Sequence, residues 1–489
     1  MNQNSFRDAA YEPVAIPPIT EAKARLPIPV LPDQPEWVEM YWRAWEIAWG
    51  NIRRPGADTK LIAPYLDATG EKQLLLWDTA FAVQFGIYGR RAFNFARLLD
   101  NFYARQHDDG FICRELNAAT GEDLFCPFAP NSTGPNILAW AEWRVYRASG
   151  DDARLAQVFW PLLAYHRWLQ DNRTWQNGLY WATGVSSGMR NQPRVPDSMS
   201  HHRHWSWVDA SMQAVLNCAI LTEMAARLQQ EELAASLTAE RASLAQLVNK
   251  QMWNLEQNYY QDVDRDGRFS RVKSIAAYWG LVDKEFVPED RLVPFVQHLR
   301  DNWSFNLPHR VPSQAADSEG YNAQSGNYWR GAVWPSTTFM VLKGLRTVGR
   351  HKLAHEIAVN HIQNVCDVYR RTDTFWENYA PETAVPGDPS RPNFVGASGV
   401  TPIAILLEDV IGLHVDWPLR RVSWDRQLDS AGAYGVLNLP IGPEGTLNLT
   451  GDKEKLTIQT DTPFTLHIRE DGQLVQAAVS VGVTEIDLT

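Results

Sequence analysis

DDARLAQVFWPLLAYHRWL, residues 151–169, is the stretch that indicates most clearly how this chain folds. Its apolar residues return at steps of three and four, the period of an amphipathic α-helix. Asp151 or Asp152 can cap the first turn. The apolar positions and one histidine that share the face are Leu155, Val158, Phe159, Leu162, Leu163, His166 and Leu169. The stretch therefore predicts a helix with one face in a core.

Similar apolar stripes recur along most of the chain and predict about ten to twelve helices. They lie at 36–50, 78–106, 134–148, 209–228, 230–252, 287–302, 334–348, 351–370 and 397–412. Residues 79–88 and 396–412 are apolar nearly all round, which is typical of helices enclosed by others. Enclosed helices that alternate with half-exposed ones predict an (α/α)6 toroid over residues 36–414. Its long aromatic loops are expected to build a site at one end.

The two ends of the chain differ from this helical region. Residues 415–489 contain alternating segments such as 456–460 and 464–468, separated by Gly-Asp and Asp-Gly turns. They predict a small all-β, sandwich-like module with a packing role. Residues 1–35 carry several prolines and are expected to be extended. Within the helical region, hairpins are predicted at 177–181 and 259–269.

The composition excludes several classes of protein. Hydrophobic residues make up 45% and charged residues 21% of 489 residues, as in a soluble globular protein with a large core. A formal net charge of −11 with no basic cluster argues against nucleic acid or an anionic membrane as a partner. No apolar run suits a membrane span or a secretory signal, which predicts a cytoplasmic protein. The sequence indicates no oligomeric state.

Metal and cofactor motifs are weak. The four cysteines are far apart and lack metal spacing. His201, His202 and His204 are spaced poorly for zinc, so solvated or stacked rings are favoured. Residues 262–267 imitate the start of a calcium loop, but position twelve is Lys273. No phosphate loop, dinucleotide fingerprint or nucleophile elbow is present. We therefore expect no cofactor and no metal.

Glu377 is the strongest candidate for chemistry. It lies in Phe375-Trp376-Glu377-Asn378-Tyr379, a carboxylate bracketed by aromatic rings. The chain holds 21 tryptophans, whose faces pack well on the apolar faces of sugar rings. A carboxylate among rings suits the base that hydrolyses a glycosidic bond. The alternative is that the rings belong to the core and Glu377 is a surface charge.

Four further clusters place acidic, amide or cationic groups beside aromatic or turn residues. In the first, Asp78 can cap a helix or bind sugar hydroxyls. In the second, Glu115 is either a ligand or the ion-pair partner of Arg114. The clusters are Trp77-Asp78-Thr79-Ala80-Phe81, residues 110–115, residues 187–197 leading to Trp207-Val208-Asp209, and residues 326–335.

In this order the clusters resemble the catalytic domains of glycoside hydrolase family 63 and its mannosylglycerate-hydrolase-like relatives, and more distantly trehalases. The motifs that carry the resemblance are Trp77-Asp78-Thr79-Ala80-Phe81, Ser187-Gly188-Met189 with Asn191 and Pro193-Arg194, Tyr328-Trp329-Arg330-Gly331, and Glu377-Asn378-Tyr379 with Pro381-Glu382-Thr383. The resemblance implies an (α/α)6 barrel and inversion at the anomeric carbon of an α-linked sugar. It also implies that Glu377 is the base.

Arg190 departs from the pattern of these relatives, whose general acid is an aspartate directly after the Gly-Met pair. A guanidinium cannot donate a proton at any working pH. Asp197 is the first replacement candidate and Asp209 the second. Alternatively, Arg190 clamps a carboxylate or phosphate of the substrate, or simply pairs with a neighbouring aspartate.

These observations predict an inverting glycoside hydrolase for a short α-linked saccharide or glycosyl conjugate. Glu377 would activate water, and Asp197 or Asp209 would protonate the leaving oxygen. The expected substrate-binding residues are Trp77, Asp78, Glu115, Arg190, Arg194, Trp329, Arg330, Trp334 and Trp376. Two rivals stay open. One is a sugar epimerase that uses His201, His202 and His204, and the other is a sugar-binding protein that lost its acid at Arg190.

Overall fold

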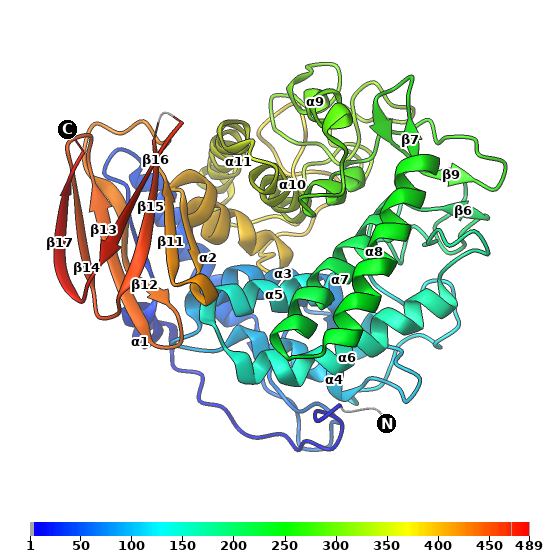
Figure 1. Ribbon diagram of the computed structural model, residues 1–489, viewed down its shortest axis with the longest axis horizontal. Coiled ribbons are helices and arrows are strands. Elements are labelled where there is room, and N and C mark those ends of the chain that lie inside the picture. The colour runs from blue at the N-terminus through cyan, green and yellow to red at the C-terminus, as the bar shows by residue number, and fades with distance from the viewer. Residues whose placement is uncertain (1–3, 471, 489) are drawn as a thin grey trace.

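The computed structural model describes residues 4–470 and 472–488, with helices up to Val410 and strands mainly after it (Figure 1). The α-helices are α1 Ile19–Ala22, α2 Pro35–Gly50, α3 Leu76–Gly86, α4 Asp100–Ala104, α5 Leu138–Ser149, α6 Asp152–Asn172, α7 Val208–Arg227, α8 Glu231–Gln251, α9 Glu289–Gln297, α10 Pro335–Thr347 and α11 His351–Thr372. The 3-10 turns are η1 Lys23–Arg25, η2 Ile87–Gly89, η3 Phe95–Leu99, η4 Ile275–Leu281, η5 His298–Arg300, η6 Ala397–Val400 and η8 Trp417–Leu419, and η7 Thr401–Val410 is π-helical.

The predicted helices are confirmed at most positions. The stretch 151–169 lies in α6, and the Asp151 side chain caps it by accepting a hydrogen bond from the Arg154 N–H at 2.9 Å. The stripe at 78–106 is different, because it breaks into α3, η2, η3 and α4. A Cβ at Gly86 would lie 2.3 Å from that of Phe95, so the chain folds back on itself there. Only glycine permits this close approach.

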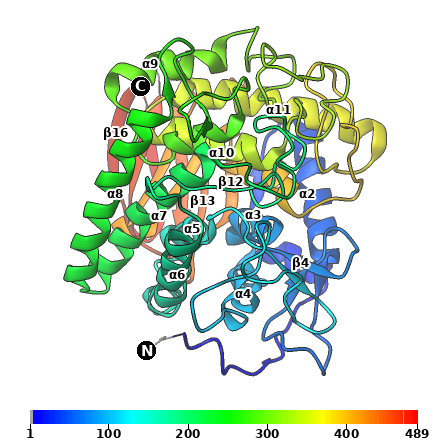
Figure 2. The same ribbon diagram turned by 90° about the vertical axis from the view of Figure 1, so that its right-hand side faces the viewer.

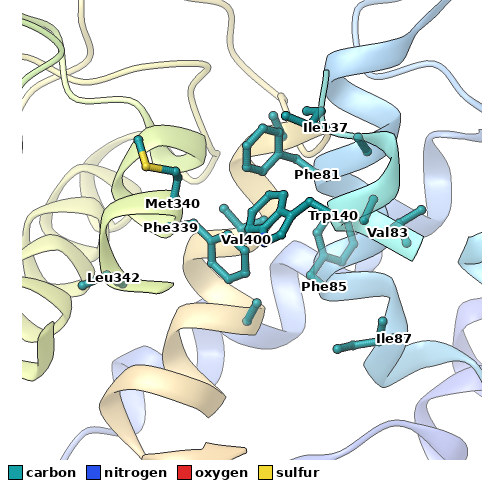
Figure 3. Close-up of a cluster of buried hydrophobic side chains, with 14 of the residues drawn as sticks. Phe81, Val83, Phe85, Ile87, Ile137, Trp140, Phe339, Met340, Leu342 and Val400 are labelled. Atoms are coloured by element: carbon teal, nitrogen blue, oxygen red, sulfur yellow. The ribbon is translucent and has the colours of Figure 1, made fainter. Parts of the chain in front are cut away.

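The centre of the helical region is an aromatic core where four segments converge (Figure 3). Phe81 of α3, Trp140 of α5 and Phe339 of α10 lie with ring centroids 5.8–6.5 Å apart. Gly399 of η6 packs against the Phe85 ring, where a Cβ would come within 2.5 Å. This core fixes the first turns of α3 and α10 and the start of η6 relative to one another.

The strands after Val410, together with β1 near the start of the chain, form two sheets, in the orders β1-β12-β13-β14-β17 and β10-β11-β15-β16. Figure 2 views the helices with these sheets behind them. The strands are β1 Ile28–Val30, β10 Leu413–Asp416, β11 Arg421–Asp425, β12 Tyr434–Ile441, β13 Gly445–Gly451, β14 Lys455–Thr460, β15 Phe464–Glu470, β16 Gln473–Val479 and β17 Gly482–Asp487. The segment before residue 36 is not merely extended as expected, because β1 pairs antiparallel with β12 and α1 precedes it.

Four short strand pairs lie among the helices and help to position loops. They are β2 Ile52–Arg53 with β3 Tyr65–Leu66, β4 Gln73–Leu75 with β5 Glu115–Asn117, β6 Trp205–Ser206 with β9 Val263–Asp264, and β7 Trp253–Asn254 with β8 Tyr259–Tyr260. Bridges between Thr174 and Tyr180 and between Val263 and Phe269 confirm the two predicted hairpins. Among the described residues, no helix combines the length and the apolar character that a membrane crossing needs.

Candidate active site

A cavity lies at the N-terminal ends of α3 and α10 and at the start of η6. Its walls are formed by Glu377 and by some residues of each of the segments 69–78, 114–115, 134–135, 185–190, 328–336 and 391–398. The cavity brings together seven of the residues predicted from sequence. They are Trp77, Asp78, Glu115, Arg190, Trp329, Trp334 and Glu377.

Asp78 lies in the first turn of α3, where a helix end favours a carboxylate. Its Oδ1 accepts a hydrogen bond from the Ala397 N–H at 3.2 Å, which ties α3 to η6. Among the described residues Asp78 has no ion-pair partner, although Arg391 and Arg190 lie close enough to lower its pKa slightly. Removal from bulk water outweighs these cations and raises the pKa of Asp78 to about 6.

Glu377 faces the same cavity, half-buried, from the loop after α11. Removal from water and the nearby Asp78 carboxylate raise its pKa to about 7, against the opposing effect of Arg391, Tyr328 and Arg190. The Tyr328 hydroxyl donates a hydrogen bond to Glu377 Oε1 at 3.1 Å. The Glu377 N–H donates to the Arg391 carbonyl at 3.0 Å, which fixes the backbone.

The segment that carries Tyr328 has an unusual backbone. Asn327 and Tyr328 both adopt positive φ values, 33° and 67°, which are uncommon for residues with side chains. Gly326 beside them leaves no room for a Cβ, which would lie 2.1 Å from the Ala332 nitrogen. Such conformations persist only where the surrounding structure determines them, and they cluster at functional sites. Here the strained turn aims the Tyr328 hydroxyl at Glu377.

Two other cavity carboxylates are engaged in ion pairs. Glu115 pairs with Arg114, and both are almost fully buried. The antiparallel pairing of Leu75 with Glu115 brings this pair beside the start of α3. Glu71 pairs with Arg391 at 2.8 Å. Asp78 and Glu377 are therefore the cavity carboxylates, among the described residues, that are not neutralised by an adjacent cation.

Indole rings form one wall of the cavity. Trp329 and Trp334 stack with ring centroids 3.9 Å apart and planes within 4°. Trp77 meets Trp329 edge-on at 6.5 Å and is the most exposed of the three. The Trp334 ring N–H donates to the Tyr328 carbonyl at 3.0 Å. These rings give the cavity an apolar face beside its carboxylates, the combination that a sugar ring requires.

Five predicted site residues do not line this cavity. Asp209 is buried in α7 and forms an ion pair with Arg194, which also pairs with Asp262 at 3.0 Å. Asp197 is exposed on the loop after Arg190. Arg330 donates through Nε to the Asn191 carbonyl at 3.2 Å, and Trp376 donates to Thr372 at 3.2 Å. The expectation that Asp197 or Asp209 faces the leaving group, and that Arg194 binds substrate, does not fit these positions.

The three histidines also lie away from the cavity. His202 packs against the Trp175 and Trp181 rings, with centroids 4.8 and 4.6 Å away, and His201 and His204 are exposed beside it. Burial lowers the pKa of His202 to about 4, with a smaller contribution from the neighbouring histidines. This is a ring-stacked surface cluster, which removes the structural basis for an epimerase built on it.

One group of potential metal ligands occurs among the described residues. His166, Cys218 and Glu240 have ligand atoms within 4.8 Å of one another. The group lies outside the cavity. Its Glu240 carboxylate already contacts His166 at 2.7 Å and pairs with Arg167. Burial raises the pKa of the Cys218 thiol, so it is protonated at neutral pH. A protonated thiol and a neutralised carboxylate are poor metal ligands.

Sequence reasoning missed three cavity residues, namely Glu71, Arg391 and the hydroxyl of Tyr328. Tyr328 lies in the predicted cluster at 326–335. Its phenol, close in sequence to the indoles of Trp329 and Trp334, was the signal that could have identified it as a site residue. Glu71 and Arg391 are 320 positions apart in the sequence, and the folded chain brings them together as an ion pair. No local sequence pattern predicts such a contact.

Chemically, the cavity holds two carboxylates with raised pKa values, an aromatic wall and three arginines. A carboxylate with a pKa of about 7 is partly ionised at neutral pH and strong enough to take a proton from water. An indole wall beside it can hold a sugar ring. The arrangement suits base-assisted hydrolysis of a glycosidic bond.

Comparison with known proteins agrees with this chemistry. Residues 72–391 match the family described as mannosylglycerate hydrolase MGH1-like glycoside hydrolase domain. An uncharacterised protein of Borreliella burgdorferi is 25% identical over 353 residues, covering 70% of this chain and 72% of that protein. A probable mannosyl-oligosaccharide glucosidase of Schizosaccharomyces pombe is 24% identical over 274 residues, covering 51% of this chain and 31% of that protein.

The fold is also similar to that of a solved enzyme. The crystal structure of the GH63 mannosylglycerate hydrolase of Thermus thermophilus in complex with glucose superposes with a TM-score of 0.61. The match has 20% identity and covers 75% of this chain and 99% of that one. The matched family and the cavity chemistry together identify the chain as a glycoside hydrolase that belongs to the mannosylglycerate hydrolase MGH1-like family.

Proposed function

We propose that this glycoside hydrolase cleaves an α-linked sugar from a short saccharide or glycosyl conjugate with inversion at the anomeric carbon. Glu377 is the base that removes a proton from the attacking water. The single observation that carries the proposal is the position of Glu377, which faces an open cavity with a pKa raised to about 7 and with Tyr328 orienting it. Inversion uses a base that activates water and forms no covalent intermediate, and an unactivated leaving group also needs a proton donor.

Asp78 has a supporting role in this proposal. Its negative charge raises the pKa of Glu377, which makes Glu377 a stronger base. Asp78 lines the cavity, where its carboxylate can accept hydrogen bonds from sugar hydroxyls. Trp77, Trp329 and Trp334 provide the surface on which the ring rests. Glu115 is held by Arg114 and is expected to bind a hydroxyl rather than to transfer a proton.

The proposed scaffold is the (α/α)6 toroid over residues 36–414, with residues 415–489 as a sandwich-like module on its flank. Support comes from the apolar α3 and η7, which are enclosed by other helices, and from the similarity to the Thermus thermophilus enzyme. The cavity at the N-terminal ends of α3 and α10 fits this scaffold, because a site at one end of a ring of helices is built from loops and helix starts.

The test is a panel of 4-nitrophenyl α-D-glucoside, α-D-mannoside, α-D-galactoside and α-L-rhamnoside, with the first-formed anomer followed by ¹H NMR. The activated leaving group removes the need for a proton donor. We expect at least one D-sugar substrate to release the β-anomer first. First release of the α-anomer would show retention and contradict the proposal.

A further inference from the structure

Besides Glu377, Asp78 is the cavity carboxylate that is free of an ion pair among the described residues, and the proposed function uses it to bind sugar hydroxyls. That assignment leaves no separate proton donor for the leaving group. Glu71 and Glu115 are bound in ion pairs with arginines. Asp78 already accepts the Ala397 N–H and lies close enough to Glu377 to raise its pKa. Asp197 and Asp209 do not line the cavity. A sugar alkoxide leaves poorly without a proton, so an ordinary glycoside is a difficult substrate for this arrangement.

Arg190 is the group that lines the cavity without a partner. Among the described residues no carboxylate pairs with its guanidinium and no side chain hydrogen-bonds to it. The Arg190 side chain is exposed, whereas Arg114 behind it is almost fully buried. Burial and the positive charge of Arg190 lower the pKa of Arg114 to about 10. Arg114 already pairs with Glu115, so Arg190 is the cavity cation that is left unmatched among the described residues, and an anion bound beside it would relieve the repulsion between the two guanidinium groups.

The backbone around Arg190 is held firmly against the wall that carries the base. The Asn191 amide donates to the Asn327 carbonyl at 2.9 Å, and its oxygen accepts the Trp329 N–H at 2.9 Å. Tyr328, between these two residues, donates to Glu377. Gly188 lies on the other side of Arg190, with φ of +82° and the Trp77 ring against it. The backbone at Arg190 is therefore held in place relative to both the base and the indole wall.

Resting on the proposed function, we propose that Arg190 binds an anionic leaving group and that the substrate class is α-glycosyl phosphates. A guanidinium cannot supply a proton, but its planar fork binds a phosphate through two hydrogen bonds. A phosphate monoester has a second pKa of about 6, so part of it is the monoanion near neutral pH, and the monoanion departs as hydrogen phosphate, HPO₄²⁻, without a proton from the protein. A carboxylate elsewhere on the leaving group would pair with Arg190 yet still leave an alkoxide to be protonated.

The step balances without a further reactant. The oxygen of water forms a bond to the anomeric carbon while the bond from that carbon to the phosphate oxygen breaks. The electron pair of the broken bond stays on the phosphate, which leaves from the monoanion as HPO₄²⁻ and is held by Arg190. The proton of the attacking water moves to Glu377 and then to solvent. The products are a β-sugar and inorganic phosphate.

The first experiment compares α-D-glucose, α-D-mannose and α-D-galactose 1-phosphates with the methyl α-glycosides of the same sugars. Phosphate release and sugar release are measured with the full chain. We expect kcat/KM for one sugar phosphate to exceed that of its methyl glycoside at least about 100-fold. Equal rates would overturn the inference, because they would require a proton donor in the cavity. A methyl glycoside that is cleaved faster would overturn it too.

Variants at Arg190 separate binding of the anion from folding. Arg190→Gln should lower kcat/KM for the sugar phosphate by about 10²–10³-fold and that for the matching 4-nitrophenyl glycoside by less than about threefold. Arg190→Lys keeps the charge and should retain part of the phosphate activity. Inorganic phosphate should inhibit nitrophenyl glycoside hydrolysis in the wild type and much less in Arg190→Gln. Equal losses on both substrates would contradict the inference.

Arg203 provides the matched control, since it is an exposed arginine on the same loop and lies outside the cavity. Arg203→Gln should leave both activities within about twofold, and a loss of phosphate activity alone in this variant would also contradict the inference. Hydrolysis of a nitrophenyl glycoside with no hydrolysis of any sugar phosphate would reject the inference and leave the proposed function intact. Failure on both substrate classes would reject the proposed function itself.

Discussion

Two groups of carboxylates in this protein are surrounded by arginine or lysine, yet they differ in how their charges are matched. In the paired cluster, defined as Arg144, Lys343, Glu408 and Asp409, both Glu408 oxygens accept from Arg144 at 2.7 and 2.9 Å. Lys343 contacts Glu408 at 2.7 Å and Asp409 at 2.6 Å. In the cavity, Glu377 has one hydrogen bond, from Tyr328.

The pKa values of Glu408 and Glu377 follow this difference, whereas burial raises the pKa of Asp409 despite its contact with Lys343. Burial alone would raise the pKa of Glu408, but Arg144 and Lys343 hold it below its ordinary value. Burial and a like charge raise the pKa of Glu377 to about 7. A fully matched carboxylate contributes to structure, whereas an unmatched one is available for proton transfer. The contrast between Glu408 and Glu377 favours the cavity over the larger charged cluster as the proposed reactive site.

The largest expected effect comes from removing the unmatched carboxylate. Glu377→Gln should fold normally and lower kcat on a 4-nitrophenyl α-glycoside by about 10²–10⁴-fold, because the amide cannot accept the proton of water. Steady-state kinetics with an active-site-independent check of folding, such as circular dichroism, measures this. Activity retained within tenfold would exclude Glu377 as the base.

Stability should respond in opposite directions at the two places. Glu408→Gln breaks a buried pair and should lower the free energy of unfolding by about 3 kcal/mol. Glu377 has a raised pKa in the folded protein, to about 7. Its ionisation therefore destabilises the fold as pH rises through about 7, and Glu377→Gln removes this cost. This variant should be more stable than wild type by about 1–2 kcal/mol at pH 8 and by less at pH 5.

Urea unfolding of both variants at pH 5 and pH 8 measures these changes. Destabilisation of similar size in both would mean that Glu377 is as well matched as Glu408, and the comparison would fail.

The same raised pKa predicts the pH dependence of activity. The base must be ionised, so kcat/KM on a 4-nitrophenyl glycoside should fall about tenfold per pH unit below about 7 and level off above it. The nitrophenyl group needs no proton, so no falling limb is expected between pH 7 and 9. A rate that is flat from pH 5 to pH 9 would contradict the assignment of the base.

The smallest effect is expected at Asp197. Its side chain is exposed and lies outside the cavity, so Asp197→Asn should leave kcat/KM within about twofold on both activated and unactivated substrates. A loss of more than 100-fold on methyl glycosides alone would restore Asp197 as the general acid. That result would also remove the reason for an anionic leaving group.

Much of the fold was accessible from the sequence because helical periodicity is local. The stretch at 151–169 carried its own cap and its own apolar face, and α6 follows it. The break between α3 and η3 was not accessible, because the contact of Gly86 with Phe95 depends on how the chain folds back. The strand β1 was also missed, because its partner β12 lies about 400 residues away in the sequence and the pairing exists only in the folded chain.

Most of the candidate site was accessible where its residues lie in aromatic motifs, and Arg190 was accessible from the motif that begins at Ser187. Trp77, Asp78, Trp329 and Glu377 are close to rings in the sequence and also in the cavity. Arg194 and Asp209 were misassigned because a charged residue in a polar motif does not reveal its partner. Their buried ion pair, with Asp262 as its third member, exists only in the folded chain.

The role of Glu377 is tested most directly by replacing the missing base with a small nucleophile. Glu377→Ala, incubated with the best 4-nitrophenyl α-D-glycoside and sodium azide, leaves room for azide where the attacking water is activated. We predict that azide restores release of 4-nitrophenol and that ¹H NMR identifies the product as the β-glycosyl azide. An α-glycosyl azide, or no restoration by azide in a correctly folded variant, would contradict an inverting mechanism with Glu377 as its base.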